Sequence, residues 1–188
     1  MAAVLPRGAN AALTREVPGL DRLVIGVRFD AGAERSVLDD TVMMALLCDA
    51  GSRVTSGDDA VFFNQLSAGE HSVTEVDDVM GDDSEQVEIR LSRVPASVER
   101  VVVVAYVNQA IGARRTLAQL KGCTVRAVNG ADGQELVRSE NLATGWGLIT
   151  AAVLAEAYRH QGGWKFKVIA DGYAGGIIDL AKDFGVPL

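Results

Sequence analysis

Histidine and cysteine are scarce in this sequence of 188 residues, which has only His71, His160, Cys48 and Cys123. Zinc sites need several histidine or cysteine ligands at close spacing, and these four residues are too few and too widely separated. Each cysteine lies beside an apolar segment, where a free buried thiol is more common than a disulfide. We therefore predict no zinc site and two free thiols, as expected in a reducing cytoplasm.

Long hydrophobic runs are also absent, since no apolar stretch approaches the roughly 20 residues that a membrane-spanning helix needs. Residues 1–7 lack the basic segment followed by an apolar segment that marks a secretion signal. The sequence also lacks a nucleophile elbow, a phosphate-binding glycine loop and a dinucleotide fingerprint. These absences lead us to expect a cytoplasmic protein with no transmembrane segment and no enzymatic activity.

The composition favours a single domain over residues 1–188. Hydrophobic residues make up 48 % of the chain and charged residues 23 %, which is enough apolar material for a sizeable core. The chain has 25 acidic and 18 basic residues and a net charge of −7, which disfavours contact with a nucleic-acid backbone. We expect no direct nucleic-acid partner.

Short strand-like segments dominate the chain. Apolar residues alternate in residues 23–29 and 87–91, which is the pattern of half-buried strands. Residues 101–107 are rich in valine, which is typical of a strand covered on both faces. Residues 123–128 lead into the turn signals of residues 129–133. These patterns predict neighbouring strands of one β-sandwich.

Helix signals are fewer. Residues 114–121 predict a short helix before Gly122, and residues 176–184 predict a helix that ends at Gly185. Residues 148–160 are ambiguous, because their alanine content favours a helix whereas the following glycines and alternating apolar residues favour a hairpin.

The most informative segment is an acidic loop at residues 76–87. It gathers five carboxylates around Gly81, and these are Asp77, Asp78, Asp82, Asp83 and Glu85. Oxygen ligands at this density suit Ca²⁺, which takes roughly six to eight of them. Carboxylates this close repel one another unless a cation or water intervenes. The alternative is a loop whose charges are simply solvated, and the loop alone leaves both possibilities open.

Several ordered motifs resemble the TerD family, the tellurium-resistance and stress-response proteins of bacteria. Residues 5–13 resemble the family's opening of leucine, a basic residue, glycine and asparagine, and residues 59–65 resemble its aromatic-asparagine-glutamine segment. The most specific likeness is EAYRHQGGWKFKV at residues 156–168, followed by GYAGG at residues 172–176. The resemblance runs from about Leu5 to Val186.

The resemblance implies an all-β fold, a two-sheet antiparallel β-sandwich with short peripheral helices and a pair of calcium sites built from acidic loops at one end. It also implies that residues 152–159 form a strand paired through residues 161–163 with residues 164–168. Tyr158 and Trp164 are then candidates for an aromatic cross-strand pair, or for support of the core and the hairpin.

The resemblance also places calcium ligands, although the sequence departs from the family pattern there. Asp39 and Asp40 stand at the family's first acidic motif, shifted in register. The second motif is shortened and lacks most glycines, whose positive φ would let backbone carbonyls wrap around an ion. One Ca²⁺ site is expected, and its candidate ligands are Asp39, Asp40, Asp77, Asp78, Asp82, Asp83 and Glu85.

Two functions follow from these observations. The first is a non-enzymatic stress-response protein in which Ca²⁺ rigidifies one end of the sandwich, so that partner proteins dock there. Its partners would be other stress-response proteins, including membrane-associated complexes. The second is a protein that binds a cyclic nucleotide or another anionic nucleotide and has no functional calcium site. Such a protein needs a basic, aromatic-lined pocket. The only residues in the sequence that suggest one are Arg114, Arg115, Arg159 and Lys165.

Overall fold

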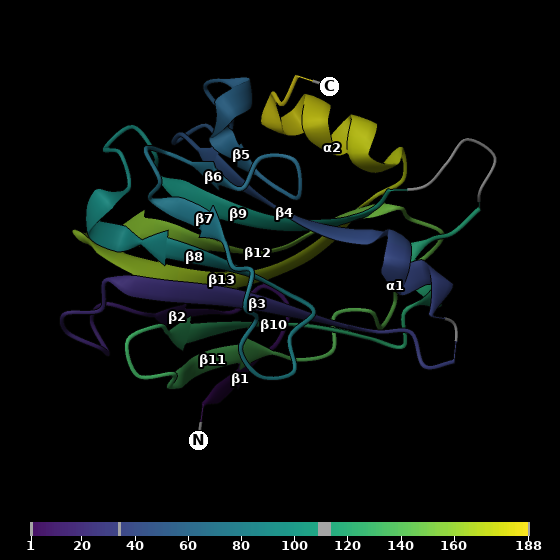
Figure 1. Ribbon diagram of the computed structural model, residues 1–188, viewed down its shortest axis with the longest axis horizontal. Helices are drawn as coiled ribbons and strands as arrows, with labels where there is room; N and C mark the ends of the chain where they lie inside the picture. The colour runs from purple at the N-terminus through teal and green to yellow at the C-terminus, as the bar shows by residue number, and fades with distance from the viewer. Residues whose placement is uncertain (1, 34, 109–113, 188) are drawn as a thin grey trace.

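The computed structural model describes residues 2–33, 35–108 and 114–187. In these residues the strands form two sheets that pack face to face, with short helices at the margins (Figure 1). The seven-stranded sheet has the order β1 (Ala3–Leu5), β11 (Glu135–Ser139), β10 (Gly122–Asn129), β3 (Arg22–Asp30), β8 (Glu85–Arg90), β7 (Val73–Glu75) and β6 (Ser67–Ala68). The six-stranded sheet has the order β2 (Asn10–Ala12), β13 (Gly163–Tyr173), β12 (Ala151–His160), β9 (Arg100–Val107), β4 (Thr41–Cys48) and β5 (Ala60–Val61).

Among the described strands, neighbours run antiparallel except for β1 and β11, which are parallel. The helices are short and peripheral, and they are α1 (Ser36–Asp40), α2 (Gly176–Phe184) and the single 3₁₀ turns η1 (Gly57–Asp59), η2 (Leu91–Arg93) and η3 (Leu117–Gln119). This arrangement confirms the predicted two-sheet antiparallel β-sandwich with short peripheral helices.

The main core lies between the two sheets. Leu23, Ile25 and Val27 of β3 are fully buried there, together with Val87 and Ile89 of β8. Their alternation along each strand is the pattern from which the strands were predicted. Burial of this apolar surface is the main favourable contribution to folding.

A second apolar cluster lies on the other face of the six-stranded sheet, beneath α2. Val102 and Val104 of β9 belong to it with Leu180 and Phe184 of the helix. Strand β9 is therefore buried on both faces, as its valine run predicts. Helix α2 ends at Gly185, which has a φ of 72°, so the predicted helix is confirmed with its glycine cap.

The predicted helix at residues 114–121 is wrong. Within it the chain forms only the three-residue turn η3, and Leu117, which begins this turn, and Leu120, which follows it, are both buried in the main core. The N–H of Lys121 then donates to the carbonyl of Asp30 at 2.7 Å and leads the chain into β10. Thr116 and Leu120, which flank the turn, both have extended backbone conformations, so the helical stretch is limited to three residues. The strand predicted at residues 87–91 also ends earlier than expected, because Leu91 lies in η2, one residue beyond the end of β8.

The ambiguous segment at residues 148–160 forms strand β12, as the resemblance implies. β12 pairs with β13 through the turn at Gln161 and Gly162, whose φ angles are 49° and 78°. β12 also pairs with β9, and its residues 151–157 are all buried. Hydrogen bonds to two neighbouring strands override the helix preference of alanine.

Of the two alternatives for Tyr158 and Trp164, the aromatic cross-strand pair does not form, because the strand register places Arg159 opposite Trp164 and Tyr158 opposite Lys165. The guanidinium carbon of Arg159 lies 4.7 Å from the centre of the Trp164 ring, which is a cation–π contact. Trp164 is buried in the main core, so the alternative role in supporting core and hairpin is confirmed.

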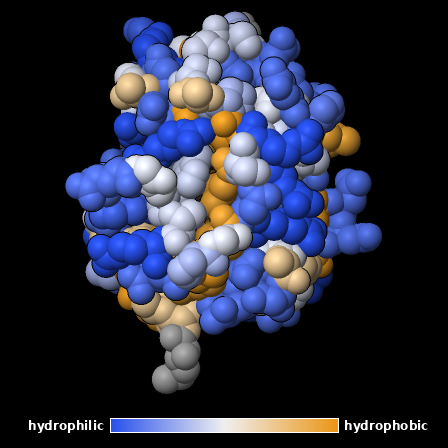
Figure 2. Space-filling view, turned by 90° about the vertical axis from the view of Figure 1, so that its left-hand side faces the viewer, coloured by the Kyte–Doolittle hydropathy of each residue, from blue (hydrophilic) through white to orange (hydrophobic). Residues whose placement is uncertain are grey.

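The surface is mainly polar where Figure 2 displays it, with a narrow apolar strip between hydrophilic side chains and smaller apolar spots toward the edges of the view. Cys48 and Cys123 are both free and buried, as predicted, and burial raises the pKa of the Cys48 thiol to about 12.

No helix within residues 2–33, 35–108 and 114–187 is long and apolar enough to cross a membrane.

Candidate metal centre and the adjoining groove

The acidic loop connects β7 with β8 and is held by Gln86, whose side chain is completely buried. The Gln86 amide donates from Nε2 to the Met80 carbonyl at 2.8 Å, and its Oε1 accepts from the Met80 N–H at 3.0 Å. Sequence reasoning missed this residue, because strand alternation places it on the outer face, where a polar side chain is expected in water. In the structure the loop folds over that face and buries it.

Asp83 of the acidic loop forms an ion pair with Arg126 of β10. The Arg126 Nε lies 2.9 Å from Oδ1 and 3.0 Å from Oδ2 of Asp83, and Gln86 Nε2 donates to Oδ2 at 2.7 Å. The Asp83 side chain is only 5 % exposed. Its carboxylate lies over Gly26 of β3, where a Cβ atom would come within 1.8 Å of Oδ2. The absence of a side chain at residue 26 thus makes room for this pair.

The other carboxylates at the tip of the loop face water. Asp82 lies 3.6 Å from Nη1 of Arg28, and their side chains are 86 % and 55 % exposed. Asp77 and Asp78 are also exposed. Exposed pairs of this kind contribute little to stability.

Glu85 points the opposite way, into the end of the sandwich, on the same face of β8 as Val87 and Ile89. Its Oε1 and Oε2 accept from the N–H of Met43 at 3.2 and 3.1 Å. Burial raises the pKa of the Glu85 carboxyl to about 7, and the neighbouring charge of Glu75 adds to this effect, while the bond from Met43 opposes it.

Glu75 of β7 shares this end of the sandwich. It follows buried Val73 by two residues, so both side chains lie on the inner face of β7. Burial, followed by the charge of Asp77, raises the pKa of its carboxyl. Its Oε2 is buried without a hydrogen-bond partner. Sequence reasoning did not include Glu75, although alternation with Val73 would have placed it inward.

The predicted ligands of the first acidic motif lie apart from this pair. Asp40 ends α1 and forms an ion pair with Arg115, while Asp39 is exposed. This ion pair engages Arg115, one of the basic residues named for the nucleotide pocket, with a carboxylate of the protein itself.

The candidate ligands thus fall into separate groups rather than one cage. Within the described ranges, no group of three or more histidine, cysteine, aspartate or glutamate side chains is placed to hold a metal ion. The carboxylates of Glu75 and Glu85, with an unpartnered buried oxygen between the sheets, fit a divalent cation in charge and in ligand type. Water would have to complete the coordination of Ca²⁺ there.

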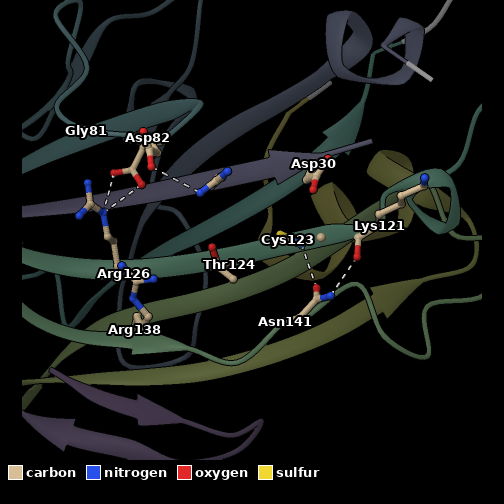
Figure 3. A pocket seen from close by; sticks show the side chains of 12 residues that line it. Asp30, Gly81, Asp82, Lys121, Cys123, Thr124, Arg126, Arg138 and Asn141 are labelled. Atoms are coloured by element: carbon tan, nitrogen blue, oxygen red, sulfur yellow. Dashed lines mark hydrogen bonds and ion pairs between the residues drawn. The ribbon is translucent and has the colours of Figure 1, made fainter. Parts of the chain in front are cut away.

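A groove of about 500 Å³ lies beside the acidic loop, on the outer face of the seven-stranded sheet. Figure 3 shows Arg126 and Arg138 at the end nearer Gly81 and Asp82, with Asp30 and Lys121 toward the other end. Arg126 and Arg138 stand opposite each other on β10 and β11, and Glu135 forms an ion pair with each. These pairs lower the pKa of the Glu135 carboxyl.

The basic residues predicted for a nucleotide pocket are not gathered in this groove. Arg159 uses its guanidinium to donate to the carbonyls of Val98 and Val94, each at 2.9 Å, so its role is structural. Lys165 lies beside the turn between β12 and β13. Arg114 and Arg115 do not line the groove either.

The fold and the loop define a class, the two-sheet β-sandwich proteins with an acidic loop between neighbouring strands. The sequence matches the TerD domain over residues 1–184, and the chain belongs to the TerD family of tellurium-resistance and stress-response proteins. This membership confirms the resemblance seen in the sequence motifs.

Relatives match over nearly the whole chain. General stress protein 16U of Bacillus subtilis (strain 168) is 35 % identical, with 97 % of this chain and 96 % of the relative covered. Tellurium resistance protein TerD of Serratia marcescens is 30 % identical, with 99 % and 98 % covered. The crystal structure of a homologue of the telluride resistance protein TerD from Streptomyces coelicolor A3(2) superposes with a TM-score of 0.63 at 19 % identity. That match covers 87 % of this chain and 96 % of the other, and it supports the fold alone.

Proposed function

We propose that this chain is a non-enzymatic stress-response protein of the cytoplasm that binds Ca²⁺ at one end of its sandwich and docks partner proteins there. Membership of the TerD family supports the stress-response role. The proposed partners are other stress-response proteins, including membrane-associated complexes.

The observation that carries the calcium proposal is the inward-facing pair of Glu75 and Glu85. Burial and like charge raise the pKa of both carboxyls, and the Oε2 atom of Glu75 is buried without a partner. A divalent cation between these carboxylates would relieve the repulsion and occupy the unpartnered oxygen. Two carboxylates supply about four oxygens, fewer than the roughly six to eight that Ca²⁺ takes, so water completes the shell and the affinity is low.

Calorimetry of chelator-stripped protein with Ca²⁺, and with Mg²⁺ for comparison, tests this proposal. We expect saturable Ca²⁺ binding with a Kd on the order of 0.1–1 mM, the range of weak calcium modules. The Glu75→Gln and Glu85→Gln variants should each lose about tenfold or more in affinity, whereas the exposed control Asp78→Asn should keep it. Absence of binding at millimolar Ca²⁺, or equal losses in all three variants, would reject the calcium proposal.

The docking part is tested separately. Capture of partners from an extract of stressed cells should depend on Ca²⁺ with the wild-type chain and lose that dependence with Glu85→Gln. Capture that is equal in chelator and in Ca²⁺ would leave a constitutive scaffold instead.

A second candidate function, binding of a small anionic ligand, is favoured by the groove beside the acidic loop. Its lining contains four basic residues, Arg28, Lys121, Arg126 and Arg138, in a chain with an acidic balance. Arg126 and Arg138 are held by Asp83 and Glu135, whereas Arg28 has only an exposed contact with Asp82, so Arg28 and Lys121 are the cations best able to meet a ligand. Thr124 belongs to β10, which lies between β3 and β11. Its side chain is on the same face of the sheet as Arg126 and offers a hydroxyl group to a ligand.

Amide NMR titrations with inorganic phosphate, cyclic AMP and uncharged adenosine distinguish this function from the first. Anion binding predicts shifts at Lys121 and Thr124 with the two charged probes, lost in Lys121→Gln and kept in Lys165→Gln. No shift at about 10 mM of either charged probe would reject the groove as an anion site.

A further inference from the structure

Arg126 is surrounded by the oxygen atoms of the acidic loop and its neighbours. Nε donates to both oxygens of Asp83 at 2.9 and 3.0 Å, and Nη2 donates to the Met80 carbonyl at 3.0 Å. Nη1 donates to Oε2 of Glu135 at 3.2 Å. One guanidinium therefore contacts two carboxylates and one backbone carbonyl, contributed by the loop and by β11.

This set of oxygens is the kind that a hard divalent cation takes, since Ca²⁺ binds carboxylates and backbone carbonyls. Here the set surrounds a side chain of the protein itself. Arginine carries a permanent charge and a planar fork of donors, so it can bind a carboxylate and a carbonyl in fixed directions. Figure 3 shows Arg126 reaching from its strand toward the loop at Gly81 and Asp82.

The surroundings hold the guanidinium in place. The side chains of Arg126 and Asp83 are 21 % and 5 % exposed, so the pair is well shielded from water. Gln86 donates to Asp83 and to the Met80 carbonyl, and so aims both acceptors at Arg126. Gly26, which stands opposite Arg126 in the strand register, leaves the space that the Asp83 carboxylate fills.

We infer that the guanidinium of Arg126 is the resident cation of the acidic loop, and that it occupies the position a divalent ion would need to bind Asp83, Glu135 and the Met80 carbonyl. This end of the loop is ordered without metal. Binding of Ca²⁺ to the wild-type chain does not involve Asp83, and removal of Arg126 uncovers a latent cation site on the other side of β8 from Glu85.

Thermal unfolding of Arg126→Gln, in chelator and in about 10 mM Ca²⁺, tests the inference. We expect a lower Tm than wild type in chelator, because the buried Asp83 carboxylate loses its cation, whereas Glu135 keeps its ion pair with Arg138. We also expect Ca²⁺ to raise the Tm of Arg126→Gln by more than it raises that of wild type, and Asp83→Asn to remove this extra rise. The matched control is Arg28→Gln, an exposed arginine on the same sheet face, which should show neither effect.

Further outcomes decide the inference on either side. Arg126→Lys keeps a charge without the fork and should be intermediate in Tm, with no extra response to Ca²⁺. An Arg126→Gln chain that folds only with Ca²⁺ supports the inference, and one that fails to fold in both conditions contradicts it. Loss of wild-type Ca²⁺ binding in Asp83→Asn would also overturn it. This inference rests on the proposed function only for the wild-type Ca²⁺ site, and the two fail differently. If the proposed function fails, the wild-type chain binds no Ca²⁺ and Glu85→Gln has no binding to weaken.

Discussion

The carboxylate of Glu85 on β8 accepts a hydrogen bond from the N–H of Met43 on β4, and so joins the two sheets at one end of the sandwich. Strand β5 pairs only with Ala45 and Leu46 of β4, so this carboxylate meets the edge of β4 beyond the end of β5. An inward-pointing charge at an open strand edge also discourages pairing with another chain. The same carboxylate is a proposed calcium ligand, which links sheet closure to cation binding.

The first prediction concerns the dependence of stability on pH. The pKa of Glu85 is about 7 in the folded protein and near its ordinary value of 4.5 in the unfolded chain. The folded state therefore holds the proton more tightly, so stability is greatest below pH 4.5 with respect to this group and falls as the pH rises to 7. The loss is about 2 kcal/mol after allowance for solvent screening, since one pKa unit corresponds to about 1.4 kcal/mol.

Urea unfolding of wild type and Glu85→Gln between pH 5 and pH 8 measures this effect. The unfolding free energy of wild type should fall as the pH rises over this range, whereas that of Glu85→Gln should fall much less. At pH 8 the variant should be at least as stable as wild type. Parallel curves for the two proteins would contradict the assignment to Glu85.

A second prediction concerns Gly26 and the space above it. Gly26→Ala should destabilise the protein by about 2 kcal/mol or more, because the added Cβ overlaps the Asp83 carboxylate and displaces it from Arg126. The control Gly147→Ala, whose Cβ meets no atom within 4 Å, should change stability little.

A double-mutant cycle in chemical denaturation separates this contact from a general effect on the strand. In an Asp83→Ala background, Gly26→Ala should cost much less than in the wild type. An equal cost in both backgrounds would show that the overlap with Asp83 is not the cause.

A third prediction concerns Arg159 at the hairpin of β12 and β13. Its guanidinium donates to the carbonyls of Val98 and Val94 and lies over Trp164. Arg159→Lys keeps the charge but loses the planar fork, so we expect a loss of about 1–2 kcal/mol in unfolding free energy. Exposed Arg15→Lys is the control, and a similar loss there would point to an effect of composition rather than of these contacts.

The sequence was sufficient for most of the fold because its strands are strongly patterned. Alternation in β3 and the valine run of β9 each identify a strand and its buried faces. The β12 strand needed the family resemblance, since its alanines favour a helix and only pairing with β9 and β13 decides otherwise. The helix predicted before β10 failed because the N–H groups of Leu117 and Lys121 donate to the carbonyls of Ile149 and Asp30, which are distant in the chain, and spacing along the sequence does not reveal such contacts.

The candidate site was predictable only in part. The acidic loop was identified, but the direction of each carboxylate depends on strand faces and on partners distant in the chain. Asp83 meets Arg126, which is 43 residues away, and Glu85 turns inward to Met43, which is 42 residues away. Glu75 was missed because it stands outside the acidic run, although its alternation with Val73 carried the signal.

Carbon-13 NMR of the side-chain carboxyl groups during a Ca²⁺ titration tests the central claim most directly, because it reports Glu75, Glu85 and Asp83 separately. We predict that Ca²⁺ shifts the Glu75 and Glu85 carboxyl signals and lowers the pKa of Glu85 from about 7, while the Asp83 signal stays fixed beside Arg126. Shifts confined to Asp82 and Asp83, with Glu75 and Glu85 unchanged, would contradict the account.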